Sequence, residues 1–144
     1  MSAHESRAAD GWATLHMKEL MDELPAMLEK QARRERHEKA VPICQQWRCV
    51  DELEQALAIL RGHSPFEAAA YGGMHETVVR EKELQLAREQ ARLEADLAAG
   101  PFGDVQEAAA ALLDERALNG YIDELNRYRR DYAYTLAQCE QVPA

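Results

Sequence analysis

The most reactive side chains in this sequence are its three cysteines and five histidines. Cys44 and Cys49 are separated by four residues, and His37, His63 and His75 are the nearest other soft ligands. Successive helical residues are about 100° apart, so thiolates at positions i and i+5 point about 140° apart and share one ion poorly. Structural zinc sites combine two closely spaced ligand pairs, and this sequence has no second pair. We therefore expect neither a metal nor another cofactor.

Catalytic motifs are missing from the sequence. It contains no G-x-S-x-G, H-E-x-x-H, G-x-G-x-x-G or P-loop pattern. Only seven glycines are present, and loops that bind phosphate need them. His16 lies near an apolar stripe beside Lys18 and Glu19, a setting more typical of the edge of a core than of a general base. We expect no enzymatic activity.

Residues 64–82 form the most distinctive local pattern, SPFEAAAYGGMHETVVREK. The first four residues predict a capping box with proline at the first helical position. Gly72 and Gly73 permit a tight turn before a second helix. The segment resembles the helix-turn-helix motif of DNA-binding proteins. That resemblance implies that the second helix enters the major groove and presents His75, Glu76, Thr77 and Arg80 to the bases.

Two features of this segment oppose the DNA-binding interpretation. Lys82 stands where such motifs usually pack an apolar side chain. The second helix also carries Glu76, Glu81, Glu83 and Glu89, which repel phosphate. The alternative interpretation is a tight corner between two packed helices.

Tyrosines and arginines alternate between residues 121 and 134. Aromatic rings and guanidinium groups together can bind a partner. The predicted partner-binding residues are Tyr121, Tyr128, Arg129, Arg130, Tyr132 and Tyr134. Tyr121, Tyr128 and Tyr132 also lie on a heptad-like seam, where their rings would belong to the core and their hydroxyl groups would reach water. Core and binding roles both remain open for them.

Turn signals divide the chain into helices. We predict a first helix over about 8–39 with a kink or break near Leu24, because Pro25 removes a backbone donor and clashes with the preceding turn. Val41-Pro42 begins a second helix that Gly62 ends. A short helix and turn occupy 63–73. Helices over about 74–98 and 105–139 follow, and the loop at 99–104 folds them into an antiparallel hairpin.

The helix over 74–98 has apolar residues on two opposite sides. Val79, Leu86, Leu93 and Leu97 form a leucine side, and Leu84, Ala87, Ala91, Ala95 and Ala98 form a side of small residues. A helix with this pattern lies between neighbours. Together with the tyrosine seam, it predicts a homodimer.

The predicted fold is an all-α protein of four or five helices, built on a long antiparallel hairpin with coiled-coil-like packing and no sheet. The 144 residues suit one domain, in which residues 8–62 form N-terminal helices packed against the hairpin of 74–139. Strong helix formers dominate, and no segment alternates with the period of a strand.

Charge and composition narrow the compartment and the partners. Residues 51–144 carry 9 basic and 18 acidic side chains, which accounts for the whole net charge of −9. Such a surface disfavours nucleic acid and anionic lipid. The sequence has no signal peptide and no apolar run long enough to span a bilayer, so we expect a cytoplasmic protein. The predicted function is a protein-binding adaptor, chaperone or inhibitor of the kind that bacterial and phage genomes encode. The alternative is a DNA-binding regulator or packaging factor using residues 64–82.

Overall fold

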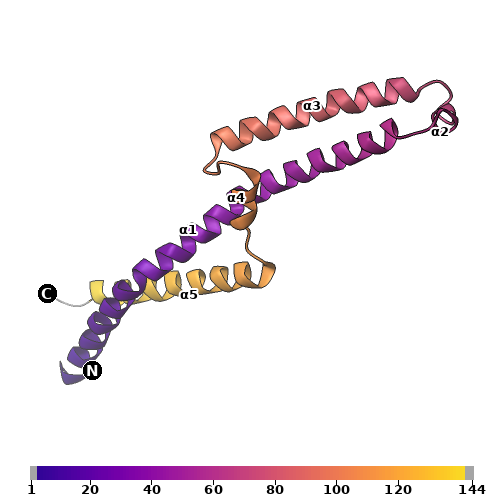
Figure 1. Cartoon of the computed structure of the whole chain (residues 1–144). Coiled ribbons are helices and arrows are strands. Elements are labelled where there is room, and N and C mark those ends of the chain that lie inside the picture. Colours follow the sequence, from indigo (N-terminus) through magenta and orange to yellow (C-terminus); the bar gives the residue numbers. More distant parts are fainter. Residues whose placement is uncertain (1–2, 142–144) are drawn as a thin grey trace. The chain divides into compact units, whose positions relative to one another are not determined.

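The computed structural model describes residues 3–141, with side chains from residue 11 onward. Within these residues the regular structure is helical throughout, with five helices and no strand (Figure 1). This confirms the all-α prediction. The helices are α1 (Ala3–Arg61), α2 (Pro65–Ala69), α3 (His75–Ala99), α4 (Val105–Ala110) and α5 (Glu115–Glu140). None of the helices in this part of the chain is both long and apolar enough to cross a membrane.

The chain divides into two compact units that share α1. The terminal unit comprises Met1–Arg36 and Leu113–Ala144, and the central unit comprises His37–Leu112. The first half of α1 and all of α5 thus belong to the terminal unit. The second half of α1 belongs to the central unit with α2, α3 and α4. The sequence predicts a single domain over residues 1–144, whereas the structure divides the chain in this way.

Helix α1 is continuous for 59 residues, so the predicted break near Pro25 and the predicted new helix at Val41-Pro42 are wrong. A proline inside a helix removes one backbone hydrogen bond and costs about 3 kcal/mol. Leu20 is buried before Pro25 and Met27 is half-buried after it, and Ala40 and Ile43 are buried around Pro42. Their packing offsets the local cost, and the helix continues.

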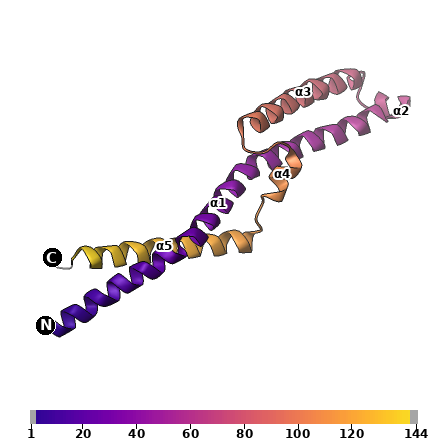
Figure 2. The same ribbon diagram turned by 60° about the vertical axis from the view of Figure 1, so that its left-hand side comes forward.

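The central unit has an apolar core formed by three helices. Ala40, Ile43 and Val50 of α1 pack with Leu93 of α3, with Ala108 of α4, and with Phe102 from the loop between α3 and α4. Arg61 pairs with Glu83, and Gln46 with Glu89, so α3 runs antiparallel to α1, as Figures 1 and 2 show. The predicted leucine side of α3 faces this core, because Leu93 is buried and Leu86 and Leu97 pack against it.

The terminal unit is an antiparallel pair of helices. His16 bonds to Asp131, Lys30 to Glu124, and Arg33 to Tyr121, so residue numbers fall along α5 as they rise along α1. Among the side chains described in this unit, residues 11–36 and 113–141, the buried ones are Ala13, Leu20, Leu125 and Thr135. Polar links between the two helices therefore supply much of the contact.

The predicted hairpin of 74–98 with 105–139 is wrong, because α3 and α5 belong to different units and each pairs with its own half of α1. The predicted helix 105–139 is two helices. Asp104 caps α4, and Asp114 caps α5 by accepting a hydrogen bond from the Ala117 amide at 2.7 Å. Each cap fixes a helix start, and the short segment between α4 and α5 leads from one unit to the other.

Candidate functional site

The segment that joins α1 to α3, residues 62–74, is ordered by local contacts, and we call it the tip. The predicted capping box is present: the Glu67 amide donates to Ser64 Oγ at 3.2 Å, and the Ser64 amide donates to Glu67 Oε1 at 3.2 Å. The hydrogen bond from the Ser64 amide is the main cause that lowers the pKa of the Glu67 carboxyl. Gly72 and Gly73 both have positive φ, at 61° and 84°, which side chains rarely permit. The tip is thus a turn of defined shape.

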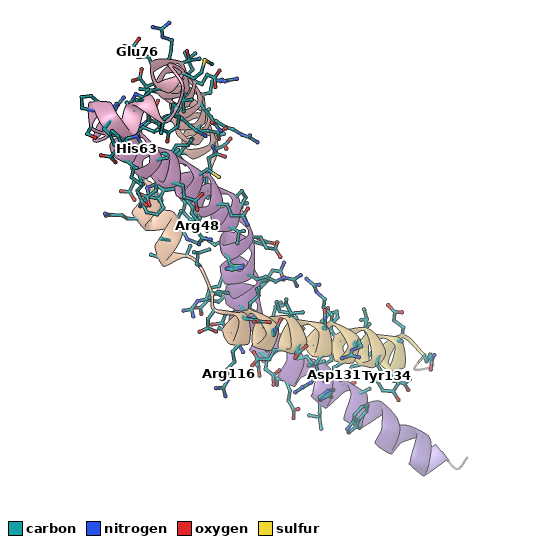
Figure 3. The ribbon with its side chains drawn as sticks, turned by 90° about the vertical axis from the view of Figure 1, so that its right-hand side faces the viewer. Arg48, His63, Glu76, Arg116, Asp131 and Tyr134 are labelled. Atoms are coloured by element: carbon teal, nitrogen blue, oxygen red, sulfur yellow. The ribbon has the colours of Figure 1, made fainter. Side chains whose placement is uncertain are left out.

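Three aromatic rings hold the tip against the end of α1. The ring centroids of His63, Tyr71 and His75 lie 5.4–5.7 Å from one another. The His75 ring bonds through Nε2 to the Leu60 carbonyl oxygen at 2.9 Å, which ties the start of α3 to the last turn of α1. Figure 3 labels His63 and Glu76 at this end of the central unit. His63 Nδ1 is buried without a hydrogen bond within the described chain.

The tip nevertheless exposes its own large apolar side chains. All five residues of α2 are described, and none is buried. Phe66 is 87% exposed and Met74 is 54% exposed, while Tyr71 keeps part of its ring in water. Complete burial of a phenylalanine side chain would contribute about 2 kcal/mol. A rigid segment that leaves such side chains in solvent is typical of a binding surface.

The predicted DNA-reading residues lie at the start of α3 with different exposures. His75 is half-buried and engaged with Leu60, whereas Glu76, Thr77 and Arg80 are exposed. A shallow cavity of about 470 Å³ beside them has a mixed lining: Arg61, His75, Glu76, Val79, Arg80 and Glu83. Arg61 bonds to Glu83 at 3.0 Å. Residues 51–83 carry seven acidic and three basic side chains, a net charge of −4. This net negative charge is unfavourable for contact with DNA phosphates.

Most of the predicted partner-binding residues of α5 contact other parts of their own unit. Tyr121 accepts a hydrogen bond from Arg33 at 3.2 Å, Tyr128 donates to the Leu20 carbonyl, and Arg129 donates to Gln31 at 3.2 Å. Tyr132 stacks on Tyr128 with centroids 6.2 Å apart. Arg130 bonds only weakly, to the Asn126 carbonyl at 3.4 Å. Tyr134 is well exposed; its place on α5 is labelled in Figure 3.

His16 forms a polar cluster with carboxylates from both helices of the terminal unit. Its Nε2 lies 2.9 Å from Asp131 Oδ2, and its Nδ1 lies 3.3 Å from Glu19 Oε2. The hydrogen bond to Asp131 is the main cause that raises the pKa of His16. A general base needs a free ring nitrogen near a substrate. Because carboxylates occupy both nitrogens, this histidine acts as a link between α1 and α5.

The cysteines are dispersed and reduced. Cys44 is half-buried beside the central core, and burial raises the pKa of its thiol. Cys49 is exposed, and Cys139 is half-buried in the terminal unit. Over the described residues, no three histidine, cysteine, aspartate or glutamate side chains form a group that could hold a metal ion.

The capping box and the glycine pair of the tip were predictable from the sequence, but the predicted binding residues lie on α5. Phe66 and Met74 were missed as candidate binding residues. Apolar side chains beside helix caps are usually read as core, and their exposure depends on which helices pack nearby. A search of protein-family models, of curated proteins and of solved structures finds no match to this chain.

Proposed function

We propose that this protein is a non-enzymatic protein-binding adaptor, of the chaperone or inhibitor type, and that its tip is the surface that contacts the partner. The observation that carries the proposal is the exposure of Phe66 on a helix fixed by a capping box. An adaptor needs a surface rather than a catalytic pocket, and the tip presents one.

The order of the tip has a local origin. The capping box contributes about 1 kcal/mol, Pro65 presets the first helical turn, and the aromatic rings of His63, Tyr71 and His75 close the turn. These contacts fix the backbone that carries Phe66 and Met74 before a partner arrives. A backbone that is preorganised in this way loses less conformational entropy on binding. Aromatic anchors that fill a pocket on the partner dominate the energy of many interfaces.

The charges around the tip indicate the chemistry of the partner. Glu67, Glu76 and Glu81 are exposed near the apolar side chains. An apolar pocket rimmed by lysine or arginine would complement this arrangement, because opposite charges steer encounter and fix register. The same acidic charge weakens the alternative of a DNA-binding regulator, which would have to use Arg80 against neighbouring glutamates.

The test compares three forms of the tagged full-length chain in a nuclease-treated lysate of its native cells. Wild type should capture one dominant protein. The amount of that protein recovered with the double variant Phe66→Ala/Met74→Ala should be at least about tenfold lower, as expected for truncation of anchor residues. Leu84→Ala is the matched control, because Leu84 is similarly exposed on α3 of the same unit. Equal capture by all three forms would contradict the role of the tip. In a parallel capture from lysate without nuclease, recovery of DNA by wild type that the variant Arg80→Glu abolishes would support the DNA-binding alternative.

A further inference from the structure

The terminal unit has two sides, which its ion pairs distinguish. His16 with Asp131, and Lys30 with Glu124, lie on the same side of the contact line between α1 and α5. Helical periodicity places Met17, Met21, Leu24 and Leu28 on the opposite side of α1, at spacings of four, three and four residues. It places Ile122 and Leu136 on the corresponding side of α5. We call these six residues the apolar side.

The apolar side is only partly covered. Met21 is 57% and Leu28 is 58% exposed, and Leu136 is exposed as well. Met17, Leu24 and Ile122 are half-buried. Arg129 lies between Ile122 and Leu136 on the same side of α5, and its guanidinium donates to Gln31 Oε1 at 3.2 Å. A helix pair with one polar side and one mainly apolar side is half of a bundle, and its apolar side needs a covering layer.

We infer that a second copy of this chain covers the apolar side, so that two terminal units form a four-helix bundle. Within the described terminal unit only three apolar side chains, Ala13, Leu20 and Leu125, are buried. So small a core does not hold a two-helix unit by itself. The cover must therefore be present whenever the chain is folded. A second copy always meets that condition, and a two-fold interface uses the same surface on both subunits.

Charge and size favour a second copy at this surface. The terminal unit carries 13 acidic and 10 basic side chains, a net charge of −3, whereas the central unit carries 13 and 7, a net charge of −6. Two copies repel each other least through the terminal unit. The 26 residues of α5 span about 39 Å, and two adjacent helices are about 20 Å wide. One whole side of this helix pair therefore measures about 800 Å², the area that each partner buries in a standard interface, and the six apolar residues occupy about the middle half of its length.

The experiment measures the mass of the full-length chain by light scattering at tens of micromolar. Wild type should have the mass of a dimer, and Met21→Glu/Leu28→Glu should have half that mass, because four carboxylates per dimer would be buried without partners. Leu15→Glu is the matched control: Leu15 lies on the same stretch of α1, is 65% exposed, and points away from the apolar side. Its dimer should persist. Circular dichroism of each form checks that the helices are retained.

A second measurement on wild type alone does not depend on the variants. The thermal midpoint of a dimer rises with protein concentration. A monomeric mass for wild type, a midpoint independent of concentration, or equal dissociation of the Leu15→Glu control would overturn the inference, as would a stable dimer of the double variant. The tip lies in the other unit, so Phe66→Ala/Met74→Ala should remain dimeric. Failure of this inference is thus separate from failure of the proposed function.

Discussion

The two halves of α1 bind a second helix in different ways. The central half packs alanine, isoleucine and valine side chains against α3 and α4, with Phe102 buried among them. The terminal half meets α5 through a histidine–carboxylate link, an ion pair and a tyrosine hydroxyl on a backbone carbonyl. Apolar burial stabilises in proportion to area, whereas each polar contact contributes about 1 kcal/mol net and requires defined geometry. We therefore expect the central unit to be the more stable of the two. The terminal unit should depend more strongly on the geometry of a few polar contacts.

The largest expected effect concerns the core of the central unit. Phe102 is 3% exposed, and Phe102→Ala should lower the free energy of unfolding by about 3 kcal/mol or more, because a cavity replaces the ring. Urea denaturation followed by circular dichroism measures the change. Phe66→Ala removes the same atoms from an exposed site and should cost less than about 0.5 kcal/mol. Similar losses for both variants would contradict the assignment of Phe102 to the core.

A smaller effect is expected in the terminal unit. Tyr128→Phe removes the hydroxyl group that donates to the Leu20 carbonyl and keeps the ring that stacks on Tyr132. The free energy of unfolding should fall by about 1 kcal/mol, the net contribution of one hydrogen bond. Tyr134→Phe removes an equivalent hydroxyl from an exposed ring and should have no measurable effect. If the two variants proved equally stable, the link between Tyr128 and α1 would not stabilise the unit.

The smallest expected effect depends on pH. The hydrogen bond to Asp131 raises the pKa of His16 above its ordinary value of about 6.5, so the protonated ring is favoured in the folded chain. Its stabilising contribution is complete below about pH 6.5 and is lost as the pH rises through the higher folded pKa. The difference in thermal midpoint between wild type and His16→Gln should therefore shrink from about pH 6 to about pH 8. A difference that stays constant or grows would contradict a charged link.

The sequence predicted the starts and ends of helices where a short motif determines them. Gly62 ends α1, Ser64 with Glu67 caps α2, and a helix begins at Val105 after the loop at 99–104, as expected. These features depend on neighbours within four residues. Asp114 is the same kind of signal and was missed, because the alanine-rich run before it reads as continuous helix.

Long-range packing could not be predicted in the same way. Pro25 and Pro42 are local signals for a break in the helix. The helix nevertheless continues through both prolines, because side chains near them pack against other helices. The heptad-like seam on α5 needs an antiparallel partner, but its periodicity fits α1 as well as α3. The sequence pattern therefore predicted which face of α5 is packed, but it did not predict whether α1 or α3 packs against that face. The exposure of Phe66 could not be predicted for the same reason, because it depends on which helices lie near the tip.

The cysteines provide each unit with its own reporter of local opening. Cys44 is half-buried against the central core, and Cys139 is half-buried on α5, while Cys49 is exposed to solvent. Thiol reagents attack the accessible thiolate, so a covered cysteine reacts only as fast as its surroundings open. Alkylation of the wild-type chain, followed by peptide mass spectrometry, would give the reaction rates of Cys44 and Cys139 in one experiment. The rate for Cys49 is the reference for an uncovered thiol.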